Sequence, residues 1–189
     1  KTALTFGYVR PNINLNSEKS YIDFEEIRHP IIERIQNDVN YVTNDLNLGI
    51  DKYGLLLFGT NASGKSSLMK AIGLNVIMAQ AGFYVAAKKF TYKPYSSLFT
   101  RINNNDNIFK GESSFAVEMS ELRAILKRAD KNSLVLGDEL CSGTESISAL
   151  SIFSSSVVKL NERQTTFIFA THLHELCKIR QVTELSTIR

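Results

Sequence analysis

One stretch constrains the fold of this chain more than any other. Residues Gly59–Ser66 read G-T-N-A-S-G-K-S and fit the pattern G-x-x-x-x-G-K-[S/T]. An apolar run, Leu55–Phe58, precedes the pattern and is short enough for a buried strand. Apolar residues at helical spacing follow it, namely Leu68, Met69, Ile72, Val76 and Ala79. The sequence therefore predicts a strand, a loop and a helix in that order, which is the setting that this pattern requires.

Such a unit binds phosphate for physical reasons. Glycines allow the loop backbone to curl so that its N–H groups face inward. The helix N-terminus adds unpaired N–H donors and a partial positive charge. In this arrangement Lys65 is expected to reach the β- and γ-phosphates of a nucleotide, and the Ser66 hydroxyl to hold Mg²⁺.

Strands and helices alternate along the rest of the chain. Short strands are predicted near 83–85, 90–92, 98–102, 134–136 and 165–170. One helix is expected from Phe115 to Ala129, and a second follows the capping-box pattern Ser142-x-x-Glu145. In the first 50 residues, Tyr21–Glu25 is predicted as an edge strand and 37–47 as a loop. The alternation predicts an α/β fold with a mostly parallel sheet flanked by helices, plus a small antiparallel N-terminal sheet.

Bulk properties narrow the class of protein. A chain of 189 residues is long enough for one domain, 1–189, which we divide into an entry segment, 1–50, and a nucleotide-binding core, 51–189. The formal net charge of +3 is too small to indicate nucleic-acid binding by itself. The two cysteines form no C-x-x-C pattern, which favours reduced thiols in an intracellular, reducing compartment. No segment is apolar enough to span a membrane, and the first residue is not Met, so we expect a piece of a longer protein.

Two acids follow the apolar segment Leu134–Gly137. Asp138 is placed to bind Mg²⁺, and Glu139 to orient and deprotonate an attacking water. A solvated strand end is the simpler interpretation of such a pair taken alone. Together with the phosphate loop, the pair favours hydrolysis over transfer to a substrate hydroxyl. Gly137 is unusual inside a strand and indicates close backbone packing.

Two further positions are candidates for contact with the γ-phosphate. His172 follows the strand Phe167–Ala170 and is predicted to donate to the γ-phosphate or to the water, although a lone histidine is more often structural. Metal binding by His172 and His174 is disfavoured, because two histidines at i,i+2 on a turn are a poor arrangement of metal ligands. Gly111–Phe115 opens a helix; either Ser113 or Ser114 caps that helix, or the helix N-terminus receives an anion. The residues alone leave both alternatives open.

These motifs, in this order, resemble the ATPase domain of the MutS family of DNA mismatch-recognition proteins. The matching segments are Arg28–Pro30, Tyr41–Asp45, Thr60–Ser67, Met78–Gly82, Phe99–Ile102, Ser113–Met119, Asp138–Thr144 and Ala170–His172. Some positions depart from the usual family pattern, notably Thr60, Ala62, Ser63 and Gly137. Lys93–Phe99 and Asp138–Glu145 are more similar to the divergent branch of giant viruses and octocoral mitochondria.

The resemblance implies a fold and a set of roles. It implies the ATP-binding-cassette type of P-loop fold and a homodimer that binds ATP between its subunits. Tyr41 is implied to stack on adenine, Asn61 to contact the γ-phosphate or the water, and Ser113 to reach ATP bound by the partner subunit. The implied nucleotide-binding residues are Tyr41, Gly59, Thr60, Asn61, Ala62, Ser63, Gly64, Lys65, Ser66 and Ser67.

The implied function is ATP binding and hydrolysis with Mg²⁺, driving dimer closure in a DNA mismatch-repair protein. Double-stranded DNA is expected to contact parts of the full-length protein outside this chain, and no membrane partner is expected. Two other functions are alternatives. A transporter-type motor is expected to carry a Leu-Ser-Gly-Gly-Gln-like signature, where this chain has Glu112–Phe115. A module that holds ATP without turnover does not need Glu139 and His172.

Overall fold

A computed structural model describes residues 2–35, 41–59, 63–102, 114–138, 140–141, 145–180, 182 and 186–188. Its centre is a five-stranded sheet with strand order β6-β7-β8-β4-β9, in which every neighbouring pair is parallel. The strands are β4 (Gly54–Leu57), β6 (Ser97–Arg101), β7 (Ser133–Asp138), β8 (Thr166–Ala170) and β9 (Ser186–Ile188). The predicted α/β fold with a parallel sheet is therefore confirmed.

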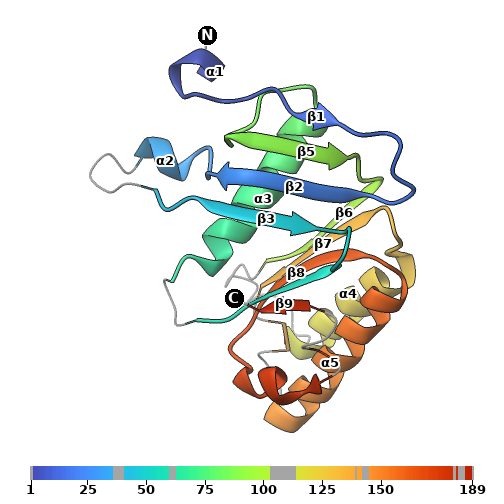
Figure 1. The fold of residues 1–189 in the computed structure, drawn as a ribbon. Helices are drawn as coiled ribbons and strands as arrows, with labels where there is room; N and C mark the ends of the chain where they lie inside the picture. Colours follow the sequence, from blue (N-terminus) through green and yellow to red (C-terminus); the bar gives the residue numbers. More distant parts are fainter. Residues whose placement is uncertain are drawn as a thin grey trace.

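Helices cover both faces of this sheet, as Figure 1 shows. Helix α3 (Lys65–Gln80) packs on one face, where Leu55, Leu57 and Leu136 belong to the same core as Met69. Helices α4 (Ser114–Arg128) and α5 (Ser146–Glu162), with the short 3₁₀ helix η1 (His174–Lys178), pack on the other face against Leu56 and its neighbours. Successive strand residues point to opposite faces, so each apolar run supplies both cores.

A second sheet of four strands covers the outer side of α3 (Figure 1). Its order is β1-β5-β2-β3, with β1 (Asn12–Ile13), β2 (Tyr21–Ile27), β3 (Asn44–Leu48) and β5 (Lys89–Lys93). The short helices α1 (Thr2–Thr5) and α2 (Ile32–Ile35) precede and follow its first strands. The expected antiparallel N-terminal sheet is confirmed for β2, which pairs antiparallel with β3 and with β5. It needs two corrections: β1 pairs parallel with β5, and β5 comes from beyond the first 50 residues.

Other local predictions also need correction. β2 is a central strand, because β3 and β5 both pair with it, and not an edge strand. Part of the predicted loop 37–47 is strand β3, whose Leu46 and Leu48 point into the core, whereas Asp45 and Asn47, which alternate with them, are exposed. Near 83–85 there is an isolated bridge between Val85 and Val9 and no strand. Helix α5 begins after Glu145, which makes no side-chain cap.

Gly137 is closely packed, as predicted. A Cβ atom at this position would lie 2.7 Å from Cδ1 of Phe169 on the adjacent strand. Among the helices of the described ranges, none is both long and apolar enough to cross a membrane.

Candidate functional site

The carboxyl ends of three parallel strands meet at one edge of the sheet. Leu57 of β4 and Asp138 of β7 both pair in register with Ala170 of β8. The N–H of Thr171 extends this contact by donating to the Leu57 carbonyl at 3.0 Å. Because ligands of open parallel sheets bind beyond the carboxyl ends of the strands, this edge is the candidate site.

Ser66 and Asp138 meet at this edge. The Ser66 hydroxyl, in the first turn of α3, donates to Asp138 Oδ2 at 2.5 Å. Asp138 is buried, with 9% of its surface exposed, and its other oxygen, Oδ1, has no hydrogen-bond partner among the described residues. A buried carboxylate oxygen without a donor is costly. A hard cation next to Asp138 and Ser66 would satisfy it, so this pair of oxygen ligands fits Mg²⁺.

Backbone groups and one lysine form the second part of the edge. Lys65 folds back over the loop, and its Nζ donates to the Gly59 carbonyl at 2.6 Å. Gly59 has φ 148°, and a Cβ atom here would lie 2.8 Å from Ser63 Oγ. Gly64, with φ 90°, is the N-cap residue of α3 and provides no side-chain cap. The N-terminus of a 16-residue helix therefore faces the loop without a capping side chain.

The other predicted residues within the described ranges are Tyr41, Ser63, Ser67 and His172. His172 is exposed after β8, and its neighbour His174 stacks on Phe58, with ring centroids 5.9 Å apart. Ser63 is exposed and Ser67 is half-buried. Tyr41 is half-buried; its burial raises the pKa of the phenol, and a hydrogen bond with the His29 backbone opposes this. The predicted residues Thr60, Asn61, Ala62, Ser113, Glu139, Gly143 and Thr144 lie outside the described residues.

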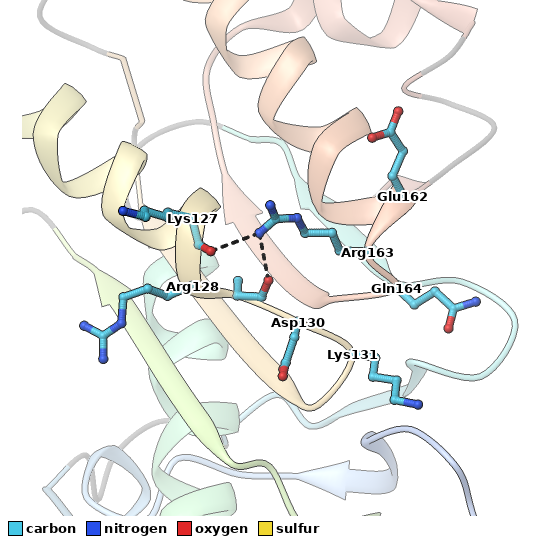
Figure 2. A pocket seen from close by; sticks show the side chains of 8 residues that line it. Lys127, Arg128, Asp130, Lys131, Glu162, Arg163 and Gln164 are labelled. Carbon is cyan, nitrogen blue, oxygen red and sulfur yellow. Dashed lines mark hydrogen bonds between the residues drawn. The ribbon is translucent and has the colours of Figure 1, made fainter.

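A hollow shown in Figure 2 lies at the opposite edge of the sheet and has a structural explanation. It is lined by the last residues of α4 and α5 and by the turns that lead into β7 and β8. Arg163 enters it and donates to the carbonyls of Leu126, Lys127 and Ala129 at 2.5, 3.3 and 3.2 Å. Arg163 therefore caps the carboxyl end of α4, and nothing in this hollow resembles the chemistry of the phosphate loop.

One buried acid was not among the sequence-predicted site residues. Glu118 of α4 is 5% exposed, and its Oε1 accepts the N–H of Cys141 at 2.6 Å. In the sequence, Glu118 stands next to Met119 and four positions before Leu122, which belong to the apolar face of the predicted helix. Acids are rarely buried unless they are paired or hydrogen-bonded, and only the structure reveals this partner.

Comparison with known proteins agrees with the motifs. The family model described as MutS domain V matches residues 55–188. A mutS homolog of Acanthamoeba polyphaga mimivirus is 42% identical over 99% of this chain and 20% of its own length. The mitochondrial DNA mismatch repair protein mutS homolog of Sarcophyton glaucum is 41% identical over 94% of this chain and 18% of its own length.

A bacterial relative gives the same result. The DNA mismatch repair protein MutS of Chlorobaculum tepidum is 39% identical over 92% of this chain and 20% of its own length. The chain thus spans about a fifth of the length of the curated relatives that it matches. Since the domain V model covers more than half of the chain, and relatives from a giant virus and an octocoral mitochondrion match as the motifs predicted, the chain belongs to the MutS family.

Proposed function

We propose that this chain is a Mg²⁺-dependent ATPase domain of the ATP-binding-cassette type, within a DNA mismatch repair protein. The contact between Ser66 Oγ and Asp138 Oδ2 at 2.5 Å is the observation that carries the proposal. It joins the end of the phosphate loop to the end of β7, where P-loop ATPases place their metal ligands. The curated relatives named as DNA mismatch repair proteins support the biological setting.

The site residues take the following roles in the proposal. The N-terminus of α3, the loop from Gly59 to Ser67 and the Lys65 ammonium bind the phosphates, and Tyr41 stacks on adenine. Ser66 and Asp138 hold Mg²⁺, which when bound neutralises charge that develops on the β- and γ-phosphate oxygens. When ATP binds, Lys65 Nζ exchanges its hydrogen bond to the Gly59 carbonyl for contacts with the phosphates.

Hydrolysis is proposed to use Glu139 and His172. The Glu139 carboxylate accepts a proton from the attacking water, which makes the oxygen a better nucleophile toward the γ-phosphorus. His172, at the end of β8, donates a hydrogen bond to the γ-phosphate or to that water. The register that places both Asp138 and Leu57 beside Ala170 supports a shared site for the ends of these three strands.

The proposed site is completed by a second copy of the protein. Ser113 at the start of α4 contacts ATP bound by the partner subunit, so nucleotide binding and homodimer closure are thermodynamically linked. Closure then switches the conformation of the longer protein on double-stranded DNA, through parts outside this chain.

Two variants test the proposal. Lys65→Ala is expected to abolish Mg·ATP binding, measured by titration calorimetry, whereas Lys70→Ala, an exposed lysine on the same helix, is expected to bind normally. Equal ATP affinity in the Lys65→Ala variant and the unchanged protein would contradict the assignment of Gly59–Ser66 as the phosphate-binding loop.

Glu139→Gln tests hydrolysis and closure together. The variant is expected to bind ATP, to lose turnover and to accumulate as an ATP-bound dimer in light scattering. A monomer with ATP bound would contradict the shared site.

A further inference from the structure

Glu118 forms a buried contact that the proposed ATPase mechanism does not use. It lies in the second turn of α4, between positions that face the core, and is 5% exposed. Its Oε1 accepts the backbone N–H of Cys141 at 2.6 Å. A carboxylate in such surroundings is tolerated only with hydrogen-bond donors, and a charge-assisted hydrogen bond to a backbone N–H is stronger than a neutral one.

The donor of this hydrogen bond lies in the turn that follows β7, defined here as the post-β7 turn, 138–141. Leu140 and Cys141 are 3% and 1% exposed and belong to the core beneath α4 and α5. A Cβ atom at Gly137 would lie 3.0 Å from Leu140 Cδ1, so the Leu140 side chain packs closely against Gly137. Cys141 has φ 64°, a left-handed conformation that a residue with a side chain adopts at a cost.

The two anchors of this turn have different origins. At its start, Asp138 is held by the Ser66 hydroxyl at 2.5 Å, and at its end the Cys141 N–H is held by Glu118 at 2.6 Å. Backbone strain persists only where the surroundings determine the conformation. The Glu118 hydrogen bond supplies that determination for Cys141, because it comes from α4, 23 positions away in the sequence, and holds the Cys141 N–H from outside the turn.

We propose that Glu118 is a positioning residue that fixes the post-β7 turn and thereby the acidic pair that this turn carries. The inference rests on the proposed ATPase function, in which Asp138 holds Mg²⁺ and Glu139 activates water. It also links that pair to α4, whose first described residue, Ser114, directly follows Ser113.

Variants of Glu118 separate the effect of side-chain length from the effect of charge. Glu118→Gln keeps an oxygen at the same distance and loses the charge, whereas Glu118→Asp keeps the charge and is one methylene too short. Glu118→Ala loses both. The matched control is Glu121→Gln on the same helix, where the carboxylate pairs with Arg101 and is about half exposed, at 48% of its side-chain surface.

The first readout is steady-state ATP hydrolysis by the full-length protein. Glu118→Asp and Glu118→Ala are expected to lower kcat by roughly 10- to 100-fold with KM within about threefold, because a small misplacement of a reacting group has such an effect. Glu118→Gln is expected to retain most of kcat, and Glu121→Gln all of it. If Glu118→Ala does not fold, the Gln and Asp variants still give opposite predictions.

The second readout is alkylation of Cys141, followed by mass spectrometry of the peptide that contains it. Burial, and then the charge of Glu118, raise the pKa of the Cys141 thiol to about 11, so this buried thiol reacts slowly. In the Asp variant the turn is expected to open and alkylation to accelerate roughly tenfold or more. The exposed Cys177 serves as the internal reference, because its rate is expected to be equal in all variants.

The two readouts distinguish the failure of each idea. If the unchanged protein does not hydrolyse ATP, the proposed function fails, while alkylation still tests whether Glu118 holds the turn. Equal kcat in the Gln and Asp variants, a change in KM alone, or equal Cys141 alkylation rates in both would overturn the positioning role of Glu118.

Discussion

Ser66 and Asp138 are 72 positions apart in the sequence, and their side-chain oxygens lie 2.5 Å apart in the fold. The parallel register of β7, β8 and β4 brings the end of one strand to the start of α3. Two side-chain oxygens from distant parts of the chain are thus brought together at this edge of the sheet. In the proposed function, a cation would interact with Asp138 Oδ1, which has no hydrogen-bond partner among the described residues.

Asp138→Asn is expected to remove the dependence of ATP affinity on Mg²⁺. Asparagine keeps the shape of the side chain but not the charge that a divalent cation requires. Titration calorimetry with Mg·ATP and with ATP plus EDTA should show that Mg²⁺ improves affinity in the unchanged protein by roughly tenfold or more, about 1.4 kcal/mol, and not in the variant. Asp51→Asn, an exposed acid before β4, is the control. An unchanged Mg²⁺ effect in Asp138→Asn would exclude this residue as a ligand.

The features that the sequence predicts well are local. The pattern Gly59–Ser66 requires a strand before it and a helix after it, and β4 and α3 occupy those places. The apolar runs at 55–57, 134–136 and 167–170 indicate buried strands without reference to partners. Their shared edge follows from the alternation of strands with helices, since parallel strands carry their ends to the same side. Ser66 and Asp138 were therefore predicted as a pair, although the distance between them was not.

The features that the sequence does not predict depend on distant pairing. No residue pattern within Tyr21–Ile27 predicts that β3 will pair on one side of this strand and β5 on the other. In Asn44–Leu48 the polar residues suggest a loop, yet burial of two alternating leucines makes a strand favourable. Glu118 and Arg163 each form a hydrogen bond with a backbone group 23 or more positions away. Such partners emerge only when packing is known.

Gly137→Ala is expected to destabilise the fold. The added methyl would lie 2.7 and 2.8 Å from two carbons of the Phe169 ring and 3.0 Å from Leu140, closer than van der Waals contact. Overpacking of this kind costs about 1–3 kcal/mol, to be measured by urea denaturation. Adding Phe169→Leu to the variant should relieve the clash, so the double variant should be more stable than the sum of the two single effects predicts. Strict additivity would show that the ring does not oppose residue 137.

Arg163→Ala is expected to lower stability through the end of α4. The guanidinium donates to three carbonyls near that end, as Figure 2 shows for two of them. Loss of charge-assisted hydrogen bonds to partly buried carbonyls should cost about 1–2 kcal/mol in the free energy of unfolding. The control is Lys127→Ala, because the exposed Lys127 contributes its backbone carbonyl and not its side chain to this contact. Equal unfolding midpoints for the two variants would rule out the capping role.

His29 is expected to make the stability of the domain depend on pH. Its Nδ1 accepts the N–H groups of Ile31 and Ile32, each at 3.2 Å, at the start of α2. Burial, and then the nearby charge of Lys70, lower the pKa of His29 below its ordinary value of 6.5, while Glu33 acts in the opposite direction. The neutral imidazole is therefore the form that the fold requires, since a proton on Nδ1 would face those donors.

The sign of the effect follows from this lowered pKa. Above pH 6.5 the residue is neutral in both the folded and the unfolded chain, and its contribution to stability is fully present. As pH falls below 6.5, the unfolded chain takes up a proton that the folded chain does not, so stability decreases by at most about 1.4 kcal/mol per pH unit until the folded pKa is reached. Urea denaturation at about pH 7.5 and about pH 5.5 measures the loss. In His29→Asn the loss should shrink, because asparagine offers an acceptor to the same N–H groups and does not titrate. If the variant loses as much stability as the unchanged protein, other groups carry the pH dependence and His29 does not.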